Sequence, residues 1–129
     1  MAKAHEVNEA RIAQAMGADG LEGRLDRLVA AIAEVRAGAR LSPRTIKLMK
    51  SGRPKMAQKV IEEAAELGIE AVRGNRAGLI SESVDLIYNL AVLWSEADVS
   101  PSEIAAEMAR REALLGMAEK LPKSASEEG

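Results

Sequence analysis

The sequence predicts an all-α fold, a bundle of about five helices built around a central antiparallel helix pair. Phe is absent, and the chain has one Trp and one Tyr. The apolar content is therefore aliphatic and weighted toward Ala, Leu, Ile and Met, which apart from Ile are good helix formers. Apolar residues recur at steps of three and four residues, and Pro and Gly lie where such segments begin and end. Together these observations favour helices over strands.

The predicted elements follow in order along the chain. A short helix is expected over 6–16, and the core helices are expected over 21–37, 43–52, 53–73, 77–97 and 100–116. Ser42 should cap the helix that Pro43 opens, and Ser100 with Glu103 should form a capping box. Gly74 is the expected stop of the helix before it. We expect one domain over 21–118, an N-terminal segment over 1–20 and a flexible tail over 119–129.

Composition narrows the classes of function. The chain has 129 residues, of which 29% are charged and 47% hydrophobic, an ordinary balance for one globular domain. A net charge of −2 gives no basic footprint, so we expect no nucleic-acid partner. The lack of cysteine excludes disulfides and thiolate metal sites and fits a reducing compartment. No signal peptide or membrane span is apparent, so we expect a cytoplasmic protein without a membrane partner.

Two pairs of acids border the predicted core. Glu63 and Glu66 share one face of the helix over 53–73, because positions three apart lie on neighbouring lines. Glu82 and Asp85 repeat this step on the next helix. The apolar rows beside the two pairs comprise Met56, Val60, Ala64, Leu67 and Ala71, then Leu79, Leu86, Ile87, Leu90, Leu93 and Trp94. Taken by itself, the first pair is explained by a solvated helix surface. The second pair repeats its spacing on an apolar helix and favours a metal site.

The two pairs are symmetric about the predicted turn, because residues 63 and 85, like 66 and 82, have their midpoint at 74. A hairpin about Gly74 should therefore place Glu63 level with Asp85 and Glu66 level with Glu82. Four carboxylates against an apolar bundle could not all stay ionised without shifted pKa values or a cation. Oxygen ligands without cysteine favour Mg²⁺ or Mn²⁺.

Basic residues lead into these acids. Lys59 lies one turn and Lys55 two turns before Glu63 on the same helix face, and Lys47 precedes both. Lysines beside a metal site are what a polyphosphate substrate requires, so these three are candidate phosphate ligands. Asn89, one turn beyond Asp85, should either orient a ligand or water or be a plain surface amide. Tyr88 and Trp94 are expected in the core or an interface rather than as a platform for base stacking.

Several motifs together resemble one known family. The acids occur as Glu-Glu-x-x-Glu and Glu-x-x-Asp, formed by Glu62, Glu63, Glu66, Glu82 and Asp85. The surrounding stretches are KVIEEAAE, ESVDLIYNLAVL, VSPSEIAAEMARR and the TIKL of residues 45–48. From about residue 25 to 111 the chain thereby resembles the phosphoribosyl-ATP pyrophosphohydrolases of histidine biosynthesis. These belong to the all-α, MazG-type nucleotide pyrophosphohydrolase superfamily.

The resemblance implies a reaction and its residues. It implies Mg²⁺ ligation by Glu63, Glu66, Glu82 and Asp85, which with Glu62 form the catalytic motif. Lys59 fills the basic position of that motif. The implied reaction is hydrolysis of the α,β-phosphoanhydride of phosphoribosyl-ATP to phosphoribosyl-AMP and pyrophosphate. The resemblance also implies a homodimer, which the nearly all-round apolar helix over 77–97 favours independently.

The chain departs from the family pattern around the acids. Asn89 stands where His is usual, Ile61 where Gly is usual, Gln58 where Lys is common and Glu70 where a small apolar residue is usual. These changes leave the acids intact but alter the surroundings of a substrate. Two alternatives therefore stay open: a housecleaning MazG-type hydrolase of another nucleoside triphosphate, and a non-catalytic helical dimer that acts as a binding module.

Overall fold

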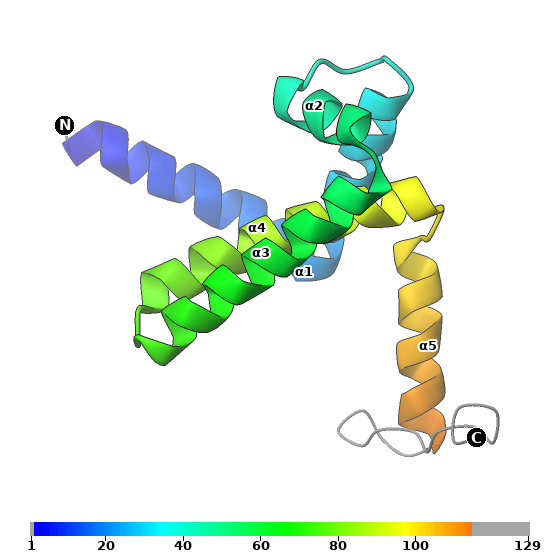
Figure 1. Ribbon diagram of the computed structural model, residues 1–129. Helices are drawn as coiled ribbons and strands as arrows, with labels where there is room; N and C mark the ends of the chain where they lie inside the picture. The colour runs from blue at the N-terminus through cyan, green and yellow to red at the C-terminus, as the bar shows by residue number, and fades with distance from the viewer. Residues whose placement is uncertain (1, 115–129) are drawn as a thin grey trace. The chain divides into compact units, whose positions relative to one another are not determined.

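A computed structural model describes residues 2–114, with side chains described over 9–12 and 20–114. Its helices are α1 (Ala2–Arg36), α2 (Pro43–Ser51), α3 (Arg53–Val72), α4 (Arg76–Ala97) and α5 (Pro101–Leu114) (Figure 1). The all-α prediction is confirmed. The predicted tail over 119–129 and the predicted end of the last helix at 116 lie outside the described residues. Among the described helices, none has the length and apolarity needed to cross a bilayer.

Helix α1 consists of two helices that meet at Gly20. This glycine has φ 64° and ψ −160°, a conformation that breaks the helix and that glycine adopts without steric cost. The segment before it is helical from Ala2, so the short helix predicted over 6–16 is longer than expected. The segment after it corresponds to the helix predicted over 21–37.

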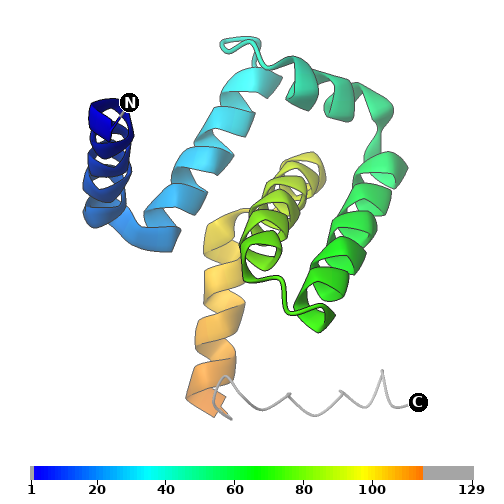
Figure 2. The same cartoon turned by 90° about the vertical axis from the view of Figure 1, so that its left-hand side faces the viewer.

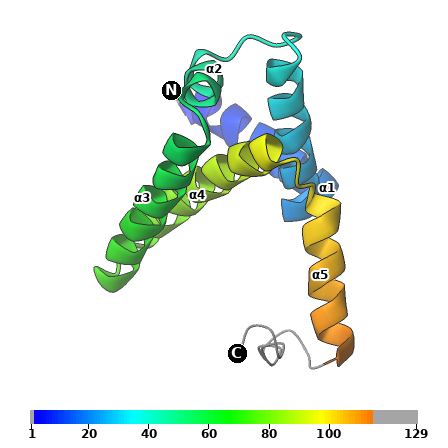
Figure 3. The ribbon, with the colours of Figure 1, turned by 45° about the vertical axis from the view of Figure 1, so that its right-hand side comes forward.

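Helices α3 and α4 form the predicted antiparallel pair and lie side by side (Figure 1, Figure 3). The turn between them is short and held by side chains. Gly74 takes φ 71° after α3 ends, and Asn75 caps α4 by accepting a 3.1 Å hydrogen bond from the Gly78 amide. The Asn75 Nδ2 also donates to Glu70 Oε2 at 2.6 Å. These bonds explain why the chain reverses at the predicted place.

The core lies at the end of the hairpin away from this turn, where α1, α2, α3 and α4 come together (Figure 2). Met56 and Val92 are fully buried there. The remaining buried members of the cluster are Ile32, Leu48 and Ala91. Because Leu48 packs into this core, α2 is held against the start of the hairpin.

Of the two predicted apolar rows only Met56 is buried, so that part of the prediction is wrong. The buried apolar residues of α4 are Ala91 and Val92, which lie outside the predicted row. On α3, Met56 is buried while Ala64 and Ala71 are exposed. On α4, Leu79 is 36% exposed although it belongs to the predicted row. The reason is that the core cluster lies at one end of the pair, so apolar positions nearer the turn lie outside it.

The two predicted caps have different outcomes. The Ser42 hydroxyl does not cap α2 and instead donates to Thr45 Oγ1 at 3.1 Å. The capping box of Ser100 and Glu103 is present: the Glu103 amide donates to Ser100 Oγ at 3.2 Å, and the Ser100 amide donates to Glu103 Oε2 at 2.8 Å.

Helix α5 belongs to a second unit that begins at Val99, after the unit that ends at Asp98.

Replacing Met56 tests the position of the core. Met56→Ala should lower the free energy of unfolding by about 2–5 kcal/mol, because it leaves a cavity in a fully buried position. Met56→Leu nearly conserves volume and should cost less than about 1.5 kcal/mol. Urea denaturation measures both. Equal losses in the two variants would contradict this placement of the core.

Candidate active site

Three carboxylates converge between the central helices. Glu63 and Glu66 come from α3 and Glu82 from α4, and each offers an oxygen within 4.8 Å of the other two. Oxygens on opposite sides of Mg²⁺ lie about 4 Å apart, because each ligand is about 2.0–2.1 Å from the ion. Small side-chain rotations would therefore let all three contact one ion. We call Glu63, Glu66 and Glu82 the acid cluster.

The acid cluster is electrostatically unbalanced. Oε2 of Glu82 is buried, and within the described part of the chain it has no hydrogen-bond partner. The pKa of Glu82 is raised to about 7, first because a hydrogen bond with Glu63 needs a proton, then because of burial and repulsion from Glu66. Two ionised carboxylates offer no donor to each other. The cluster must therefore hold a proton near neutral pH or face a cation, which is the condition that a hard divalent ion satisfies.

Asp85 does not join the acid cluster, contrary to the expectation that four carboxylates converge. Its Oδ1 lies 3.9 Å from Arg44 Nη2 on α2. Residues three apart on a helix differ by about 60° in direction, so Asp85 need not point where Glu82 points. The symmetry about Gly74 sets the height of each acid along the hairpin but not its direction around the helix axis.

Glu62 also lies outside the acid cluster. Its Oε1 accepts a 2.7 Å hydrogen bond from Gln58 Nε2, and its Oε2 lies 3.5 Å from Lys59 Nζ. The Gln58 hydrogen bond, with smaller contributions from Lys59, lowers the pKa of Glu62. Glu62 is thus an ionised neighbour of Lys59.

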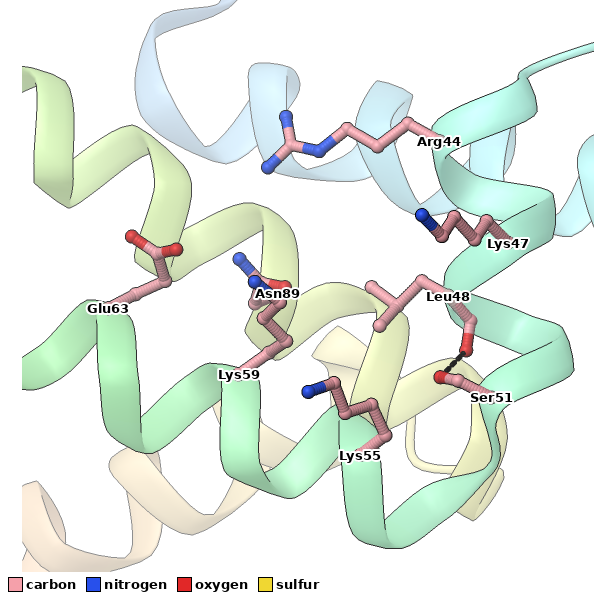
Figure 4. A pocket seen from close by; sticks show the side chains of 8 residues that line it. All are labelled: Arg44, Lys47, Leu48, Ser51, Lys55, Lys59, Glu63 and Asn89. Carbon is pink, nitrogen blue, oxygen red and sulfur yellow. Dashed lines mark hydrogen bonds between the residues drawn. The ribbon is translucent and has the colours of Figure 1, made fainter.

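A basic pocket of about 250 Å³ adjoins the acid cluster (Figure 4). Its charged lining residues are Arg44 and Lys47 from α2, with Lys55, Lys59 and Glu63 from α3. All three lysines predicted as phosphate ligands therefore line one pocket, which Glu63 connects to the acids. Arg44 was missing from the predicted site. Its spacing from Lys47, one helical turn, is the signal that could have indicated it.

Asn89 forms part of the pocket wall and is only 2% exposed. Its Nδ2 donates to the main-chain oxygen of Asp85 at 2.8 Å, one turn earlier on α4. The burial shows that the alternative of a plain surface amide is wrong. The side chain is in place to contact a ligand in the pocket.

Acids that converge across a helical hairpin beside a basic pocket are the arrangement expected of the all-α, MazG-type nucleotide pyrophosphohydrolases. Comparison with known proteins agrees. Residues 25–112 match the family described as phosphoribosyl-ATP pyrophosphohydrolase. The chain belongs to this family.

Curated relatives bear closely related names. The chain is 54% identical to phosphoribosyl-ATP pyrophosphatase 2 of Rhodopseudomonas palustris over 100 residues, which cover 78% of this chain and 76% of the relative. It is 48% identical to the protein of the same name from Bradyrhizobium diazoefficiens, with 78% and 75% covered. Phosphoribosyl-ATP pyrophosphatase of Azospirillum brasilense is 46% identical, with 74% and 86% covered. No solved structure matches the chain significantly.

The raised pKa of Glu82 predicts how stability depends on pH without metal. Between its ordinary value of 4.5 and about 7, the unfolded chain releases a proton that the folded chain retains. The free energy of unfolding should therefore fall as pH rises through this window. Urea denaturation in EDTA measures the fall.

Two variants make this test specific. Glu82→Gln should remove the Glu82 contribution to the fall, because the amide does not titrate. Glu62→Gln is the matched control, since Glu62 lies outside the acid cluster, and it should keep the fall. An unchanged pH dependence in Glu82→Gln would contradict the electrostatic account of the cluster.

Proposed function

We propose that this chain hydrolyses phosphoribosyl-ATP to phosphoribosyl-AMP and pyrophosphate in histidine biosynthesis. The acid cluster beside the basic pocket is the observation that supports this reaction most directly. The names of the relatives, at 46–54% identity, support the substrate. The absence of cysteine fits a reducing compartment, and we place the activity in the cytoplasm.

We propose Mg²⁺, or Mn²⁺ in its place, as the cofactor. Glu63, Glu66 and Glu82 would hold the ion, and Asp85 is the fourth acid of the motif. Oε2 of Glu82 has no hydrogen-bond partner among the described residues, and this supports the assignment because a cation would give it one. Such an ion, when bound, neutralises phosphate oxygens and lowers the pKa of the attacking water.

The chain's own cations would carry out the other half of the chemistry. The basic pocket is lined by Lys47, Lys55 and Lys59, which would bind the phosphates. The same lysines would stabilise the negative charge that develops on the departing pyrophosphate. Glu62 lies 3.5 Å from Lys59 and would help to orient it. The buried Asn89 would contact the substrate from the pocket wall.

A panel of substrates tests the reaction. Pyrophosphate release from phosphoribosyl-ATP should far exceed release from ATP, dATP or dUTP, and EDTA should abolish it. Glu66→Gln and Glu82→Gln should each lower kcat by about 100-fold or more, because each removes a proposed ligand of the ion. Glu34→Gln, on α1, is the control and should keep full activity.

The panel also separates the alternatives. If a plain nucleoside triphosphate were hydrolysed faster than phosphoribosyl-ATP, the protein would be a housecleaning hydrolase rather than the histidine-pathway enzyme. No turnover of any nucleotide with Mg²⁺ would instead favour a binding module.

We also propose that the protein is a homodimer. Apolar side chains remain exposed on the outer surfaces of the central hairpin, among them Ile61 and Val72 on α3, with Ile80 and Val84 on α4. Val72 is 90% exposed and Val84 62%. Four large apolar side chains exposed on one helical hairpin support an association surface there.

Sedimentation equilibrium tests the dimer. Val84→Glu should shift the protein toward the monomer, because the proposed interface would bury an unpaired carboxylate. Leu41→Glu is the matched control: Leu41 is also exposed and apolar but lies between α1 and α2, so this variant should sediment as the wild type does. A wild-type monomer, or equal effects of both variants, would contradict the proposal.

A further inference from the structure

Arg44 has two neighbours on α4. Its guanidinium carbon lies 4.3 Å from the centroid of the Tyr88 ring, within the range of a cation–π contact. Its Nη2 lies 3.9 Å from Asp85 Oδ1, while the Arg44 side chain is 65% exposed. An ion pair this long and this exposed contributes little. Arg44 can therefore exchange Asp85 for another anion while it stays stacked on the ring.

The Tyr88 ring is held in place from α2, the helix that carries Arg44. The Tyr88 hydroxyl and Thr45 Oγ1 share a 2.6 Å hydrogen bond, and Thr45 is buried. The Ser42 hydroxyl donates to the same Thr45 oxygen at 3.1 Å. These bonds fix the ring relative to the backbone next to Arg44. They restrict the orientations that the stacked guanidinium can take.

We infer that Arg44 binds a phosphate of the substrate, that Tyr88 and Thr45 position it, and that it leaves Asp85 when phosphate enters the basic pocket. This inference rests on the proposed function, because it assigns a residue to the same site. Figure 4 shows the Arg44 guanidinium extended from α2 over the space that Lys47, Lys55 and Lys59 border. A planar guanidinium can bind a phosphate through two parallel hydrogen bonds, which a lysine cannot do.

The exchange follows from the charges around Arg44. Asp85 offers one negative charge at 3.9 Å. A pyrophosphate in the pocket offers more charge and faces three lysines there as well. Arg44 therefore gains by moving to the phosphate, and the move leaves the Asp85 carboxylate available to a different cation.

Binding of pyrophosphate to the full chain in EDTA, measured by calorimetry, tests the inference without turnover. Arg44→Ala should weaken binding by about tenfold, the loss of one charge-assisted contact. Arg44→Lys keeps the charge but not the paired hydrogen bonds and should fall between wild type and Arg44→Ala. Arg40→Ala removes an arginine that pairs with Glu34 outside the pocket and should bind as the wild type does.

Variants of Tyr88 separate positioning from folding. Tyr88→Phe keeps the ring and loses only the bond to Thr45, so it should weaken binding less than Tyr88→Leu, which removes the cation–π contact. In hydrolysis assays Arg44→Ala should raise KM more than it lowers kcat.

The outcomes are distinct. Wild-type affinity in Arg44→Ala, an equal loss in Arg40→Ala, or no pyrophosphate binding by the wild type would each overturn the inference. Absence of hydrolysis in a protein that binds pyrophosphate through Arg44 would instead remove the proposed function alone.

Discussion

Repulsion among three carboxylates is the constraint on which the rest of the site depends. The packing of α3 against α4 and the short turn at Gly74 and Asn75 hold Glu63, Glu66 and Glu82 together although like charges oppose it. The cost appears at Glu82, whose pKa is raised to about 7 and whose Oε2 has no hydrogen-bond partner in the described part of the chain. Such unfavourable contacts are concentrated at ligand sites, and this one favours a cation between the three acids.

The neighbouring basic pocket depends on the same hairpin. Leu48 packs with Met56 in the core, and this packing holds α2 against the start of α3. Arg44 and Lys47 from α2 then share the pocket with Lys55 and Lys59 from α3. The basic pocket and the acid cluster are therefore neighbours, and Glu63 belongs to both. Such an arrangement suits a substrate that carries phosphates and meets a metal ion.

The sequence predicts the hairpin and the proximity of Glu63, Glu66 and Glu82 because helical rise is set by backbone hydrogen bonds and hardly varies. It predicts the direction of a side chain less well. Asp85 faces Arg44 rather than the acid cluster, and helix spacing alone does not indicate this. The contact of Arg44 with Tyr88 joins α2 to α4 and leaves no periodic signal. The exposure of Ala64 and Leu79 depends on where the core ends, which apolar periodicity does not specify.

The most direct test of the central claim is anomalous scattering from a crystal grown with Mn²⁺. We expect a manganese peak within coordination distance, about 2 Å, of carboxylate oxygens of Glu63, Glu66 and Glu82. A structure in which manganese is absent from these three side chains while they keep their mutual contacts would contradict it.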